Sequence, residues 1–188
     1  MIPVDQTIAR SLYVATYTGR QFYPLDPQQD QVDIEDIAHG LAYQCRFNGQ
    51  TRHFYSVAQH SLIVAGLVPR RFRLAALLHD AAEAYMGDMV KPLKQLFPMF
   101  SAIEAKVMAA IGARYGIADF EDRAIKRADL VALAMEKRDL MPNSTEAWGS
   151  LKGIVPSPTR ITPLSPQEAK ALFLEKFLSG VRTDVKDV

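Results

Sequence analysis

Three apolar segments with helical spacing each carry ionisable residues among their hydrophobic positions. His60 and Asp129 lie inside two of these segments, and the adjacent residues His79 and Asp80 end the third. An ionisable group on an apolar face costs free energy unless it is paired or bound to a cation. A fold that brings the three segments to one interior point satisfies all of these groups with a single divalent ion. The sequence therefore predicts a helical bundle with a metal site near its centre.

The dipeptide His79-Asp80 is the most demanding of these features. It lies in the run Leu-Leu-His-Asp-Ala-Ala-Glu, where a carboxylate is expensive to desolvate unless it is paired or metal-bound. Either histidine alone would more often be a hydrogen-bonded core residue. Imidazole together with carboxylate suits Mn, Fe, Co, Ni or Zn rather than Ca or a bare Mg site. The predicted cofactor is one such ion, with the ligands His60, His79, Asp80 and Asp129.

Length and charge restrict the class of protein. A chain of 188 residues can bury a continuous core, so residues 1–188 are expected to form one domain with its core at about 33–140. The 22 basic and 21 acidic residues nearly cancel, which disfavours a polynucleotide or membrane partner. A single cysteine, no signal pattern and no run of about 20 apolar residues make the cytoplasm the expected location.

Helical periodicity runs through most of the chain, and no alternating stretch of convincing length indicates a strand. Capping-box spacing at Ser56, Ser101 and Ser165 predicts helix starts, with Pro166 at a first helical position and Gly180 just past an end. The expected fold is all-α, a bundle of about six helices with an irregular N-terminal segment. The first expected helix begins after Asp33. Five more are expected over residues 56–67, 71–86, 101–115, 121–140 and 166–179.

Two regions lack this periodicity. Residues 16–31 mix aromatics with Gly and Pro, which favours a short hairpin or a loop packed over the helices. Residues 142–166 carry several prolines and lead into the last helix, so that 142–180 reads as a C-terminal loop and helix. A loop of this length is either a lid or binding segment or a solvated tether.

The order of His60, His79-Asp80 and Asp129 resembles that of the HD-domain metal-dependent phosphohydrolases, over about residues 46–140. Three stretches are similar to the bacterial 5′-deoxynucleotidase branch: Ser-Val-Ala-Gln-His-Ser, His-Asp-Ala-Ala-Glu-Ala-Tyr-Met-Gly-Asp and Lys-Pro-Leu-Lys. The resemblance implies an HD-domain helical bundle around one metal ion. Dinuclear relatives need further histidines after the His-Asp pair, and here no histidine follows His79.

Two more acidic residues are expected to take part in the reaction. Glu83 follows His79 by four residues and Asp80 by three, so it shares their face of the predicted helix. In a metal phosphohydrolase a nearby carboxyl group moves protons, which makes Glu83 the expected acid-base residue. Asp88 resembles the family's second acidic residue, which orients the sugar or the water. The alternatives are a helix-end carboxylate for Glu83 and a turn aspartate for Asp88.

Phosphate binding requires fixed positive charge, and Arg46 and Lys94 are the best candidates. Arg46 lies where the nucleotidases carry an arginine followed by an aromatic residue that crowds the sugar 2′ position. Phe47 replaces their commoner tryptophan, which weakens the expected discrimination against ribose. Lys94 ends the run that resembles the family's Gly-Asp-x-x-x-Pro-x-Lys pattern. A solvated surface role is the alternative for both basic residues.

The expected reaction is metal-dependent hydrolysis of a nucleoside 5′-monophosphate, with a deoxynucleoside favoured, to release inorganic phosphate. One alternative is a deoxynucleoside triphosphohydrolase, and another is a catalytically silent nucleotide-binding metal domain. A (p)ppGpp hydrolase is disfavoured because Ala84 follows Glu83 where that group usually has a second acid. Relatives are often dimers, and the apolar content of residues 124–141 suits either a homodimer interface or the core.

Overall fold

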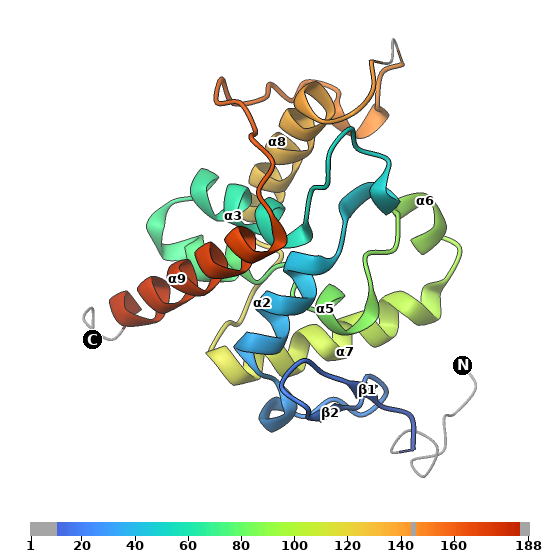
Figure 1. Cartoon of the computed structure of the whole chain (residues 1–188), viewed down its shortest axis with the longest axis vertical. Helices are drawn as coiled ribbons and strands as arrows, with labels where there is room; N and C mark the ends of the chain where they lie inside the picture. The colour runs from blue at the N-terminus through green and yellow to red at the C-terminus, as the bar shows by residue number, and fades with distance from the viewer. Residues whose placement is uncertain (1–10, 144–145, 185–188) are drawn as a thin grey trace.

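The computed structural model describes residues 11–143 and 146–184, and it is predominantly helical (Figure 1). The expected all-α class is therefore confirmed. Within these ranges, no helix combines the length and apolar character needed to cross a membrane. The helices are α2 (Ile34–Tyr43), α3 (Val57–Leu67), α4 (Arg73–Leu77), α5 (Glu83–Met86), α6 (Lys91–Lys94), α7 (Pro98–Tyr115), α8 (Arg123–Asp139) and α9 (Pro166–Asp184), with 3-10 turns η1 (Gln29–Gln31), η2 (Arg46–Gly49), η3 (Arg70–Phe72) and η4 (Gly149–Leu151).

Helix α3 lies at the centre of the described helices and contacts α2, α4, α8 and α9. Its sequence is apolar almost all round, which is typical of a helix buried on every side. Val57, Ala58 and Val64 are fully buried in the core. His60 lies among these residues, so its imidazole is placed in the interior by the same packing that holds the helix.

The N-terminal segment forms a two-stranded hairpin, one of its two expected forms. Strands β1 (Val14–Ala15) and β2 (Gln21–Phe22) are antiparallel, with Val14 opposite Phe22. The ring of Phe22 is fully buried and stacks on Tyr85 of α5, with 3.8 Å between ring centroids. The hairpin therefore packs against the short helix that begins at Glu83.

The helix expected over residues 71–86 is interrupted, so that prediction was wrong. α4 ends at Leu77 and α5 begins at Glu83, and His79 and Asp80 lie in the turn between them. The ring nitrogen Nδ1 of His79 lies 2.7 Å from the carbonyl oxygen of Ala76, which a continuing helix would offer to the amide of Asp80. The side chain thus competes with the backbone for this acceptor, and both site residues leave the helix.

Two other helix ends differ from expectation. α7 begins at Pro98 rather than at Ser101, and Glu104, expected in a capping box, instead pairs with Lys94. α9 continues past Gly180 to Asp184, because a single glycine inside a helix is tolerated at a modest cost in free energy. The capping boxes at Ser56 and Ser165 do cap their helices: their Oγ atoms accept hydrogen bonds from Gln59 N and Glu168 N.

The long segment before α9 is held against the helices at several points. The carboxylate of Asp139 accepts hydrogen bonds from Arg138, Arg160 and the backbone amide of Ile161. The side chain of Gln59 on α3 bonds backbone groups of the same segment, at Thr162 and Leu164. These contacts disfavour the solvated-tether alternative for the described part of residues 142–166.

The apolar face of α8 is buried within a single chain. Its buried positions include Ile125, Ala128, Ala132 and Met135. Packing in the core of one chain therefore accounts for these residues of the segment 124–141, and a homodimer interface is not needed to explain them.

We expect Gly40→Ala to destabilise the contact between α2 and α5. A Cβ atom at Gly40 would lie 2.9 Å from both Cβ and O of Ala84, the residue after Glu83. Overpacking of this kind typically costs ~1–3 kcal/mol, which lowers the Tm of a chain this size by roughly 2–12 °C. Thermal unfolding measures the change. Gly66→Ala on α3 is the matched control, since nothing lies within 4 Å of its added Cβ; an equal fall in both variants would contradict the prediction.

Candidate metal centre

Three separate elements bring a histidine, a second histidine and an aspartate together. His60 comes from the middle of α3, His79 from the turn between α4 and α5, and Asp129 from α8. One ligand atom of each lies within 4.8 Å of the others. The convergence that the sequence predicted for these three residues is therefore confirmed, and the group could hold a metal ion.

Asp80 lies against both histidines of this group. Its Oδ2 atom is 3.6 Å from Nε2 of His60 and 3.3 Å from Nε2 of His79. The Nε2 atom of His60 is also 3.2 Å from Oδ1 of Asp129. Bonds of ~2.0–2.2 Å to one ion place neighbouring ligand atoms roughly 3–4 Å apart, so these spacings suit a common cation.

The nitrogen atoms that face the group have no hydrogen-bond partner. Nε2 of His60 and Nε2 of His79 are both buried and make no hydrogen bond of acceptable geometry, although carboxylate oxygens lie close to both. Their other ring nitrogens are held: Nδ1 of His79 by the carbonyl of Ala76, and Nδ1 of His60 by Glu136. Metal-ligating histidines usually have this arrangement, with one nitrogen on the ion and the other donating to an oxygen. The residues therefore fit a divalent cation.

Glu136 is a residue of the centre that the sequence interpretation missed. It lies on α8, is fully buried, and places Oε1 2.6 Å from Nδ1 of His60. Tyr55 donates its hydroxyl to the same oxygen at 2.9 Å, and Arg46 reaches Oε2 at 3.4 Å. Its position seven residues after Asp129, two turns along the same helix face, was the signal that could have identified it.

The charges around His60 favour a cation. Burial and the charge of Arg46 oppose protonation of its ring, but the carboxylates of Glu136 and Asp129 outweigh both effects and raise the pKa of His60 to about 9. Burial alone would raise the pKa of Asp129, yet the adjacent ring of His60 and the charges of His79 and Arg46 hold it well below its ordinary value. Acidic oxygens thus draw positive charge to this point, and a divalent ion supplies it without a proton.

The centre is open to solvent on the side of Asp129. The exposed fraction of the Asp129 side chain is 42%, against 23% for Asp80 and none for His60. The sequence placed Asp129 at an interior point of the bundle, but its side chain is partly exposed because its position on α8 borders the surface. This exposure gives a substrate a route to the ligand group.

Glu83 is the first residue of α5 and is almost completely buried. Its Oε2 atom has no hydrogen-bond partner. Burial, together with the nearby carboxylates of Asp80 and Asp88, raises the pKa of Glu83 well above its ordinary value. A carboxyl group whose pKa is raised beside the ligand group is suited to general acid catalysis.

Asp88 follows Gly87, whose φ of 88° requires a glycine. Burial raises the pKa of Asp88, although the charge of Arg46 opposes this effect. In the orientation that satisfies both ends of its side chain, the amide nitrogen of Gln44 donates to the backbone carbonyl of Glu83, and its oxygen accepts from the backbone N–H of Asp88. The backbone at the two predicted catalytic residues is therefore linked.

The predicted phosphate contacts differ in their surroundings. Arg46 is 13% exposed, and its guanidinium lies 3.5 Å from Asp80 and 3.4 Å from Glu136, so it is part of the centre rather than a surface cation. Lys94 instead pairs with Glu104 of α7 at 2.5 Å, which already compensates its charge. The sequence did not predict this pairing.

Phe47 follows Arg46 and has a left-handed backbone. Its φ is 55° and that of Asn48 is 50°, a conformation that costs free energy in residues other than glycine and is frequent at functional sites. The Phe47 ring lies 5.4 Å from the Arg46 guanidinium and 6.1 Å from the ring of Trp148. Trp148, which the sequence interpretation did not single out, thus extends the aromatic surface beside Arg46.

The other two histidines lie outside the ligand group. His39 is stacked between Tyr17 and Tyr43, with centroid distances of 3.8 and 4.4 Å, and His53 is exposed. Neither belongs to the group of His60, His79 and Asp129 found among the described residues. This distribution suits the expected single metal ion.

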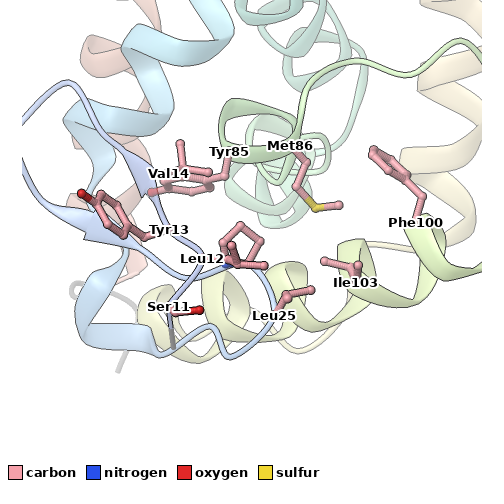
Figure 2. Close-up of a pocket in the computed structure, with 10 residues that line it drawn as sticks. Ser11, Leu12, Tyr13, Val14, Leu25, Tyr85, Met86, Phe100 and Ile103 are labelled. Atoms are coloured by element: carbon pink, nitrogen blue, oxygen red, sulfur yellow. The ribbon is translucent and has the colours of Figure 1, made fainter. Parts of the chain in front are cut away.

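A separate apolar hollow of about 420 Å³ lies between the N-terminal segment and α7 (Figure 2). Its lining includes Leu12, Tyr13, Tyr85, Met86 and Ile103. None of the predicted ligands, catalytic residues or phosphate contacts lines it, so the metal centre is a different part of the molecule.

No family model matches the chain, but two curated relatives align with most of it. The uncharacterized protein YfdR of Escherichia coli (strain K12) is 40% identical over 166 residues, which cover 88% of this chain and 93% of the relative. The uncharacterized protein RCAP_rcc00048 of Rhodobacter capsulatus is 38% identical over 175 residues, which cover 83% of this chain and 89% of the relative. Alignments of this extent indicate a shared family, and the names state no activity.

Proposed function

The chain belongs to the same family as the Escherichia coli protein YfdR, and we propose that it is a metal-dependent phosphohydrolase of the HD-domain type. Its substrate would be a nucleoside 5′-monophosphate, with a deoxynucleoside favoured, and its products the nucleoside and inorganic phosphate. The observation that carries the proposal is the pair of partnerless Nε2 atoms of His60 and His79, which face the carboxylates of Asp80 and Asp129.

The ligand set in this proposal is His60, His79, Asp80 and Asp129 around one Mn, Fe, Co, Ni or Zn ion. When bound, such an ion lowers the pKa of a coordinated water and polarises a phosphoryl oxygen. The exposed side of Asp129 leaves room for the phosphate to approach. Arg46 lies next to Asp80 and would stabilise negative charge on the phosphoryl oxygens.

Glu83 would act as the general acid. Its raised pKa favours the protonated carboxyl group, whose proton can pass to the 5′ oxygen as the bond to phosphorus breaks. Asp88, next along the chain after Gly87, would orient the sugar or the attacking water. Phe47 and Trp148 would border the nucleoside, since their rings adjoin Arg46.

The compensated charges favour a monophosphate over a triphosphate. Arg46 is shared between Asp80 and Glu136, and Lys94 is paired with Glu104, so neither is a free cation for a polyphosphate tail. A deoxynucleoside triphosphohydrolase is therefore the second candidate, and a silent nucleotide-binding metal domain the third.

A substrate panel separates the three candidates. With Mn²⁺ or Co²⁺ present, we expect nucleoside 5′-monophosphates to be hydrolysed faster than the corresponding di- and triphosphates, with inorganic phosphate as the product. Release of intact tripolyphosphate would identify the triphosphohydrolase instead. Metal and nucleotide binding with no hydrolysis of any member would identify the silent domain.

A further inference from the structure

We propose that Glu136 is a positioning residue of the metal centre. Its carboxylate turns Nε2 of His60 toward the ligand group and holds Arg46 beside Asp80. The inference rests on the proposed function in one respect, that the centre binds a divalent cation.

The first step concerns the proton on the ring of His60. Oε1 of Glu136 lies 2.6 Å from Nδ1, and both side chains are fully buried. An ionised carboxylate can only accept, so the neutral ring, which is the form that binds a metal, carries its proton on Nδ1 and offers the lone pair of Nε2. Without this acceptor, the neutral ring could carry its proton on Nε2, because Oδ1 of Asp129 lies 3.2 Å away and would accept it. Glu136 therefore selects the tautomer that can bind the ion.

The second step concerns what fixes the carboxylate itself. The fully buried Tyr55 donates its hydroxyl to Oε1 at 2.9 Å, while the guanidinium of Arg46 lies 3.4 Å from Oε2. Both oxygens of Glu136 are thus restrained from outside α8. Because Asp129 lies on the same helix, α8 contributes one proposed ligand and orients another as a single rigid element.

The third step concerns Arg46. Its guanidinium is shared between Glu136 and Asp80, at 3.4 and 3.5 Å. If Glu136 lost its negative charge, Asp80 would be the only one of these two carboxylates left to pair with Arg46. Arg46 would then compete with the metal for the Asp80 oxygens. Two independent effects, on His60 and on Asp80, then weaken metal binding in the same direction.

The experiment is a Co²⁺ titration of the metal-free full-length protein, followed by its visible absorption well below the Tm. We expect Glu136→Gln to weaken Co²⁺ binding by about 10- to 100-fold, the usual effect of removing a hydrogen-bond partner of a ligand. Asp139→Asn is the matched control, because Asp139 is a buried, ion-paired carboxylate at the end of α8 that holds the loop instead. It should lower the Tm and leave the Co²⁺ affinity unchanged.

Tyr55→Phe provides a second variant that keeps the charge of Glu136. Removal of one hydrogen bond to the carboxylate should weaken Co²⁺ binding by roughly two- to tenfold. If Glu136→Gln does not fold, an unchanged affinity in Tyr55→Phe overturns the proposal. If it folds, a lower Tm with unchanged Co²⁺ affinity overturns it, since Glu136 is then only structural.

The same titration distinguishes this inference from the proposed function. Wild-type protein that binds Co²⁺ but hydrolyses no phosphate ester refutes the hydrolase and leaves the role of Glu136 supported by the variant affinities. Wild-type protein that binds no Co²⁺ overturns the positioning role itself.

Discussion

Replacing Glu83 by glutamine should lower kcat by about 100- to 10,000-fold while the protein keeps its metal and its fold. The carboxyl group is nearly fully buried, has one partnerless oxygen, and has a pKa well above the ordinary value. Glutamine has the same shape and cannot give up a proton at neutral pH. The variant therefore removes proton transfer and little else.

Steady-state kinetics with a nucleoside monophosphate and elemental analysis of bound metal check this result together. KM should change little, because the lost interaction acts in the transition state. Asp88→Asn is the informative comparison: near-normal kcat in Glu83→Gln and a large fall in Asp88→Asn would transfer the proton-transfer role to Asp88. Loss of metal from Glu83→Gln would instead make Glu83 a ligand.

The second large effect is expected from the ligands. Protein stripped with a chelator should be inactive and regain activity with Mn²⁺ or Co²⁺, whereas His79→Ala and Asp80→Ala should not recover. His79 contributes one of the two buried, partnerless Nε2 atoms, and Asp80 lies against both imidazoles. Removing either side chain takes away a proposed ligand that no other residue of the group can replace.

Metal content measured beside activity makes this prediction decisive. His53→Ala is the control, because His53 is exposed and lies outside the ligand group, so its metal content and activity should match the wild type. Full activity of His79→Ala with normal metal content would refute the assignment of that residue.

Much of the fold follows from periodicity and capping alone. The apolar pattern predicted α3 and α8 to within a few residues, and Ser56 and Ser165 cap the helices that they were expected to cap. The break between α4 and α5 was missed because it depends on the contact of the His79 ring with the carbonyl of Ala76. Periodicity reports which face is buried and contains no information on such side-chain contacts to the backbone.

Part of the site was predictable because buried ionisable residues cost free energy unless they are paired or bound to a cation. His60, His79 and Asp129 meet as expected. Glu136 was missed because its partner His60 is 76 residues away, and a glutamate on a helix is ordinary unless its tertiary neighbours are known. The pairing of Lys94 with Glu104 was missed for a related reason, since it joins the separate helices α6 and α7.

The distance in sequence between His60 and its partners on α8 also bears on how the protein is made. During synthesis, α3 leaves the ribosome long before Asp129 and Glu136 have been translated, so His60 has neither neighbour at that stage. The centre can close only after α8 packs on α3, one of the contacts between distant segments that form late because a long loop must close first. If the centre binds an ion as proposed, metal uptake would be a late event of folding, and a metal-dependent signal in a refolding experiment would time the packing of α8 on α3.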